Sequence, residues 1–141
     1  MPFRTSLDAL ATAVSEPIEP DAAKEWLRNT EPFCRRGEGR WERNHRRLRR
    51  TFRDIEENDL SLAPCVSELR ASGRSLTRRW ARLCDRVQDQ PEPALGSADE
   101  SERAGHLKSD LQDWVSSARE LDSAAITWLL ESVYRERGIS G

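Results

Sequence analysis

The stretch Gly39–Asn58, GRWERNHRRLRRTFRDIEEN, decides the fold. Its least polar positions recur at spacings of four, three, four and three, which is the period of one side of an α-helix. These positions are Trp41, His45, Leu48, Phe52 and Ile55. The other side carries arginines, namely Arg40, Arg43, Arg46, Arg47, Arg49, Arg50 and Arg53. The stretch therefore predicts a helix that packs by one side and presents guanidinium groups on the other.

Two further runs with the same period follow along the chain. The second run comprises Val66, Leu69, Gly73, Leu76, Trp80, Leu83 and Val87. The third run comprises Leu107, Leu111, Trp114, Ala118, Leu121, Ala125 and Trp128. No useful length of sequence alternates with the two-residue period of a strand. We therefore expect an all-α fold, an antiparallel helical bundle of three long helices.

The N-terminal part is expected to add two short helices to this bundle. Leu10 and Val14 lie on one side of the first, and Pro20 suits the first helical position of the second. A boundary is expected around residues 30–32, and the arginine-rich helix should start firmly near Gly39. A start as early as Glu31 is the alternative.

Residues 1–141 are expected to form a single helical domain, because a chain of this length can bury its own core. Residues 89–101, DQPEPALGSADES, contain two prolines and a glycine and predict a linker before the C-terminal helical segment. Charge is also divided along the chain. Residues 35–86 hold 15 arginines against 8 acidic residues, a net charge of +7, whereas the remainder carries −9.

The sequence offers no motif for catalysis, a metal or a cofactor. Cys34, Cys65 and Cys84 lack a CxxC spacing, and His106 has no neighbouring cysteine or second histidine. The common nucleophile, zinc and nucleotide-binding motifs are missing as well. We expect no catalytic residues, no metal and no cofactor. Because the densest apolar stretch, 124–130, is too short to span a bilayer, we expect a cytoplasmic protein without membrane contact.

The tryptophans are expected to anchor the core rather than to stack on bases. Four of them occupy core positions of the three helical runs, and the fifth lies on the apolar side of its short helix. Aromatic rings at helical spacing are usually buried anchors. The five residues are Trp26, Trp41, Trp80, Trp114 and Trp128.

Arg40 and His45 are separated by four residues, and this RxxxxH spacing resembles that of HEPN-type ribonucleases, which are also helical bundles. The resemblance covers six residues. In that family the residue after the arginine is usually small and polar, whereas Trp41 stands here. The resemblance implies RNA cleavage as a distant alternative function. In the other interpretation, His45 is a packed and hydrogen-bonded histidine of the core.

The arginines are the strongest candidates for a binding surface. Arginines on the outer side of a helix can follow a phosphate backbone without reading bases, and no known base-reading motif is present. We expect sequence-nonspecific contact with DNA or RNA through Arg40, Arg43, Arg46, Arg47, Arg49, Arg50, Arg53, Arg74, Arg78 and Arg82. The alternative is a solvated surface, or one that acidic parts of the same chain neutralise.

The end of the C-terminal helix is apolar around most of its circumference, whereas a surface helix needs only one stripe. Either this helix is central to the bundle or its spare side contacts another subunit. We favour an interface with a protein partner or a second copy, formed by Ile126, Leu130, Val133 and Tyr134. The sequence thus predicts a non-enzymatic helical subunit of a larger nucleoprotein complex. A protein–protein adaptor is the alternative.

Overall fold

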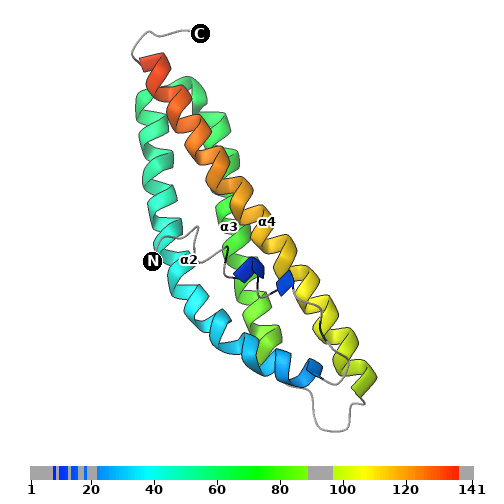
Figure 1. Cartoon of the computed structure of the whole chain (residues 1–141). Coiled ribbons are helices and arrows are strands. Elements are labelled where there is room, and N and C mark those ends of the chain that lie inside the picture. Colours follow the sequence, from blue (N-terminus) through cyan, green and yellow to red (C-terminus); the bar gives the residue numbers. More distant parts are fainter. Residues whose placement is uncertain are drawn as a thin grey trace.

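Three long helices make up the computed structural model, which describes residues 8, 10–12, 14, 15, 18, 22–88 and 97–136. They are α2 (Ala23–Asn58), α3 (Ala63–Gln88) and α4 (Ser97–Glu136), and the short 3-10 helix η2 (Leu60–Leu62) joins α2 to α3. The described residues contain no strand. The all-α fold with three long helices is therefore confirmed (Figure 1).

The three helices lie side by side in an elongated bundle (Figure 1). The Cys84 thiol donates to the carbonyl oxygen of Cys34 at 3.6 Å, and the indole nitrogen of Trp41 donates to Thr77 Oγ1 at 2.9 Å. Rising residue numbers on α2 thus meet falling numbers on α3. The two helices run in opposite directions, and the chain returns through α4.

α2 is one continuous helix instead of two segments. It runs through Pro32 and Gly39 without interruption, so both the expected boundary around residues 30–32 and the expected start near Gly39 are wrong. A proline inside a helix costs about 3 kcal/mol or more. Leu27 and Cys34, on either side of it, are both buried in the core. We attribute the continuity of α2 to this burial, which local propensity does not reflect.

The N-terminal segment packs on α4. Its described residues between 8 and 15 are helical, and Leu10 and Val14 belong to the main core. The side-chain amide of Gln112 donates to the carbonyl oxygen of Val14 at 2.9 Å, and Arg119 forms an ion pair with Asp8. The other residues of the expected first short helix lie outside the described part of the chain.

The second short helix and the linker have different outcomes. Trp26, expected in a short helix of its own, belongs to α2. Of the expected linker, residues 89–96 lie outside the described part of the chain, and α4 begins at Ser97.

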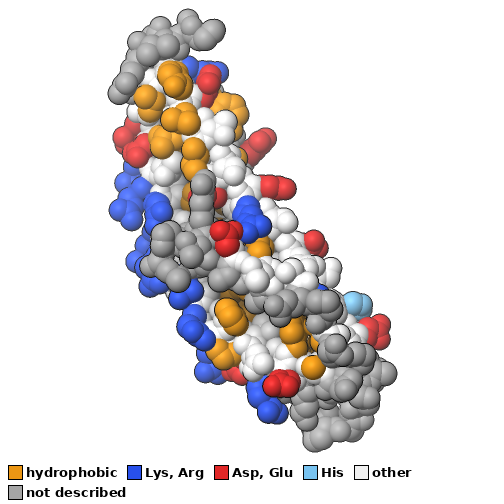
Figure 2. Space-filling view, viewed as in Figure 1, with side chains coloured by type: hydrophobic (Ala, Val, Ile, Leu, Met, Phe, Trp, Pro, Cys, Tyr) orange, Lys and Arg blue, Asp and Glu red, His pale blue; other side chains and the backbone are white. Residues whose placement is uncertain are grey.

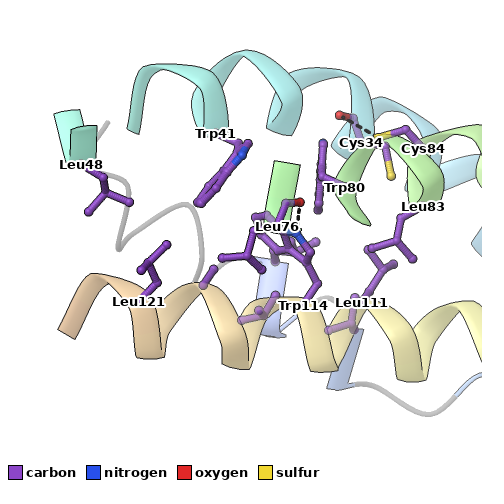
Figure 3. Packing of buried hydrophobic residues seen from close by; sticks show 14 of the residues in the cluster. Cys34, Trp41, Leu48, Leu76, Trp80, Leu83, Cys84, Leu111, Trp114 and Leu121 are labelled. Carbon is purple, nitrogen blue, oxygen red and sulfur yellow. Dashed lines mark hydrogen bonds between the residues drawn. The ribbon is translucent and has the colours of Figure 1, made fainter. Parts of the chain in front are cut away.

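Three tryptophans form the centre of the core (Figure 3). Trp41, Trp80 and Trp114 are each only 2% exposed. The Trp114 ring lies edge-on to Trp41 with 5.2 Å between centroids, and 4.5 Å from Trp80. Its indole N–H donates to the carbonyl oxygen of Leu76 at 2.9 Å, which satisfies the polar atom of a buried ring. The remaining tryptophans are partly buried and pack against this core: Trp26 and Trp128.

Gly37 marks a close approach of α2 to α3, and it generates the first prediction. A Cβ atom at this position would lie 2.5 Å from Cζ2 of the buried Trp80, whereas one at Gly39 would meet nothing within 4 Å. We predict that Gly37→Ala destabilises by about 1–3 kcal/mol, because overpacking outweighs the gain in helix propensity. Gly39→Ala should stabilise by up to about 1 kcal/mol. Chemical denaturation measures both, and equal effects of the two changes would contradict the packing.

Candidate nucleic-acid interface

The outer side of α2 carries a dense band of positive charge. Residues 43–53, RNHRRLRRTFR, contain six arginines and no acidic residue, and all six arginines are exposed. At a rise of 1.5 Å per residue, they occupy about 15 Å of helix. Figure 2 shows Lys and Arg side chains gathered along this edge of the molecule. With the half-buried Arg40, these residues form the arginine face: Arg40, Arg43, Arg46, Arg47, Arg49, Arg50 and Arg53.

The core determines where this face lies. Leu48, Phe52 and Ile55 are at most 4% exposed and point into the bundle. Because the arginines occupy the positions between these residues, packing of the apolar side leaves them in solvent. The sequence prediction that the arginines point outward is correct for α2.

The arginine face is not neutralised within the described part of the chain. The ion pairs found there involve other arginines, namely Arg35, Arg70, Arg86, Arg119 and Arg135. Acidic residues stand at the two ends of the dense stretch, with Glu42 before it and Asp54 after it. The guanidinium groups between them are available to an external anion.

The three α3 arginines do not extend this face as one surface. Arg74, Arg78 and Arg82 are all exposed. Arg74 follows Gly73, which contacts α2, whereas Arg82 lines a depression between α3 and α4 together with Asp110. The arginine face is therefore formed by the seven α2 arginines alone among the ten singled out from the sequence.

His45 lies at the contact between α2 and α3. Its imidazole stacks on Trp41 with 5.5 Å between centroids and an angle of 10° between planes. The Nδ1 atom is 3.4 Å from Thr77 Oγ1, and the Nε2 atom faces Gly73, where a Cβ would come within 2.8 Å. His45 is thus half-buried and packed, as the core interpretation expected, with one edge near solvent.

Charge as well as burial acts on this imidazole. Burial first, and then the positive charges of Arg49 and Arg74, lower the pKa of His45 below its ordinary value of 6.5. The pKa of His45 therefore responds to positive charge on both α2 and α3.

Arg40 and His45 do not face each other on α2. Five residues correspond to a rotation of about 140° around an α-helix. His45 contacts Thr77 and Gly73 of α3, which fixes its direction. The RxxxxH spacing therefore does not bring the two side chains together within one helix.

The C-terminal end of α4 exposes an apolar patch. Ile126, Leu130 and Tyr134 are 43%, 54% and 52% exposed, and their four-residue spacing puts them on one side of the helix. Val133 beside them is half-buried. Figure 2 shows hydrophobic side chains gathered at this end of the bundle. These four residues are called the α4 apolar patch below.

Buried thiols are the remaining reactive groups. Cys34 and Cys84 lie next to each other between α2 and α3 (Figure 3), and Cys65 is half-buried, with all three as free thiols. Hydrogen bonding to Cys34, together with burial, raises the pKa of the Cys84 thiol. These contacts indicate a packing role for the pair.

Comparisons with known proteins do not assign the site. No protein-family model, curated protein or solved structure matches the chain. Within the described ranges, no three His, Cys, Asp or Glu side chains are grouped to hold a metal ion. No helix in the same ranges is long and apolar enough to cross a membrane. The arginine face and the α4 apolar patch are the two surfaces of the described residues that favour a function.

The lowered pKa of His45 predicts a loss of stability in acid. The unfolded chain has the ordinary histidine pKa of about 6.5 and binds the proton more readily than the folded protein. Stability should therefore fall as the pH falls through about 6.5. Chemical denaturation gives the free energy of unfolding at about pH 7.5 and at about pH 5.5. Between these two pH values it should fall more for the wild type than for His45→Gln. Parallel losses would contradict this role of His45.

Proposed function

We propose that this protein is a non-enzymatic helical subunit that binds nucleic-acid backbone, without sequence preference, through the arginine face. The observation that carries the proposal is six exposed arginines, with no acidic residue among them, along about 15 Å of one helix. Duplex DNA carries one charge per 1.7 Å of axis, so an equal length presents about nine phosphate charges. One guanidinium group can donate two parallel hydrogen bonds to two oxygens of the same phosphate.

The rest of the chain limits how this binding can occur. Outside residues 35–86 the net charge is −9, which repels a polyanion. Attraction is therefore confined to residues 35–86, which include the arginine face, and should weaken steeply as salt screens it. An acidic protein partner is the second candidate. RNA cleavage has no such support, because Arg40 and His45 lie about 140° apart around α2.

Neutralising the centre of the arginine face should abolish most of the binding. We predict that Arg43, Arg46, Arg47 and Arg50, all changed to Gln, reduce the slope of log affinity against log salt by about 3–4. Each lost phosphate contact releases about one counterion fewer. Fluorescence anisotropy with a labelled duplex of about 20 base pairs measures the slope, and circular dichroism checks helicity.

The matched control removes the same charge elsewhere. Changing Arg86, Arg103, Arg119 and Arg135 to Gln affects arginines of α3 and α4 that hydrogen-bond within the chain. This variant should retain the wild-type slope. An equal loss would mean that total charge, and not the arginine face, governs binding. A wild-type protein that binds no nucleic acid at about 50 mM salt would favour the adaptor function.

We further propose that the α4 apolar patch docks a protein partner or a second copy of the chain. Three large apolar side chains, each over 40% exposed, lie in line on a chain of which 34% is charged. A continuous apolar patch on such a surface commonly marks an association site. The arginine face is on a different helix, so the two surfaces do not overlap.

Charging the α4 apolar patch should separate association from folding. We predict that Leu130→Lys with Tyr134→Lys dissociates an oligomer or partner complex while leaving monomer helicity unchanged, because both side chains are more than half exposed. Light scattering after size exclusion measures the association. The control is Ser67→Lys with Ala71→Lys, two exposed α3 positions at the same spacing. A wild type that is monomeric and copurifies with no partner would refute the docking role, and an unfolded variant would place the patch in the core.

A further inference from the structure

We propose that Arg49 and Arg74 form a phosphate-binding subsite across the contact between α2 and α3, directly over the edge of His45. The subsite rests on the proposed function and makes it more specific, because it defines one point at which a phosphate of the backbone is held. It is distinct from the centre of the arginine face, where all side chains come from α2 alone.

The two arginines flank one imidazole. Arg49 lies one turn after His45 on α2, and residues at this spacing are neighbours on a helix surface, with about 5–6 Å between Cβ atoms. Arg74 directly follows Gly73, and Gly73 packs so closely on His45 that a Cβ there would come within 2.8 Å of Nε2. Both arginines are exposed and form no ion pair with another described residue.

The imidazole between them is held in one orientation. Thr77 donates its only hydroxyl proton to the carbonyl oxygen of Gly73 at 3.0 Å and accepts from the indole of Trp41 at 2.9 Å. The Nδ1 atom of His45, 3.4 Å from this hydroxyl, therefore carries the proton of the neutral ring. Stacking on Trp41 fixes the plane of the ring. Nε2 is left as the atom that gains a proton in acid.

The charges around His45 leave a positive excess. Its neighbours on α2 are Glu38, Glu42, Arg46 and Arg49, and those on α3 are Arg70, Arg74 and Arg78. Arg70 is paired with Glu56 at 3.5 Å. On the α4 side, His45 stacks on Trp41, and Trp41 in turn contacts Trp114. Two acids against four arginines without an ion pair among the described residues, Arg46, Arg49, Arg74 and Arg78, favour an anion at this position even before His45 is charged.

A bound phosphate would change the titration of His45. The charges of Arg49 and Arg74 now oppose protonation, and an anion between them would cancel that effect. We expect the His45 pKa to rise by about one unit on binding. The oligonucleotide should therefore bind about tenfold more tightly when His45 is protonated than when it is neutral. The pH dependence should disappear in His45→Gln, although this variant keeps both arginines.

The test follows the His45 ring by NMR during titration with a single-stranded thymidine oligonucleotide of about ten residues. In the wild type the His45 pKa should rise at saturation. Arg49→Gln with Arg74→Gln should abolish this rise while the remaining arginines still bind. The matched control, Arg43→Gln with Arg50→Gln, should weaken binding but preserve the rise at saturation.

The outcomes separate the subsite from the function on which it rests. An oligonucleotide that binds without changing the His45 pKa overturns the subsite and leaves the proposed function intact. A wild type that binds no oligonucleotide overturns the proposed function. In that case the His45 pKa is measured with inorganic phosphate instead. A rise in the wild type that is absent from the variant with Arg49→Gln and Arg74→Gln would support the subsite, and any other result would overturn it.

Discussion

The contact between Trp41 and Trp114 is the interaction on which the bundle depends. Trp41 comes from the arginine-rich helix and Trp114 from the C-terminal helix, and their rings meet at 5.2 Å with an angle of 78°. The indole of each donates to α3, at Thr77 and at Leu76. One pair of rings thus connects all three helices at the same position along the bundle axis. This contact fixes which side of α2 faces inward, and therefore which side presents arginines to solvent.

Periodicity in the sequence predicted the parts of the structure that depend on one helix at a time. The spacing of Leu48, Phe52 and Ile55 was enough to show that the arginines between them face outward, and burial of these three residues confirms it. The same reasoning failed at Pro32, because the cost of a proline is local whereas the burial that offsets it is supplied by other helices. It was also incomplete for Trp128, which occupies a core position but is only partly buried.

What the sequence could not show is which residues of different helices meet. The sequence places Arg74 in the same helical run as Arg78 and Arg82 and does not relate it to His45. The register between α2 and α3 puts Gly73, the residue before Arg74, against the His45 ring. The helical period places Gly73 on the packing side of its helix, but it does not say which residue of α2 it meets. Functional sites shared by two helices are accordingly the hardest to recognise from sequence.

The exposed arginines of α2 lie along one side of the bundle, and such an uneven distribution of charge contributes to an electric dipole. A protein with a net charge of only −2 gains little from its total charge near a polyanion, but a dipole experiences a torque in that field. During a diffusional encounter with the proposed polyanion, such a torque would turn α2 towards the negative chain before any contact forms. The α4 apolar patch, which carries no charge, is not drawn into the encounter. The fold can therefore approach a charged polymer in one preferred orientation while its hydrophobic surface stays available to something else.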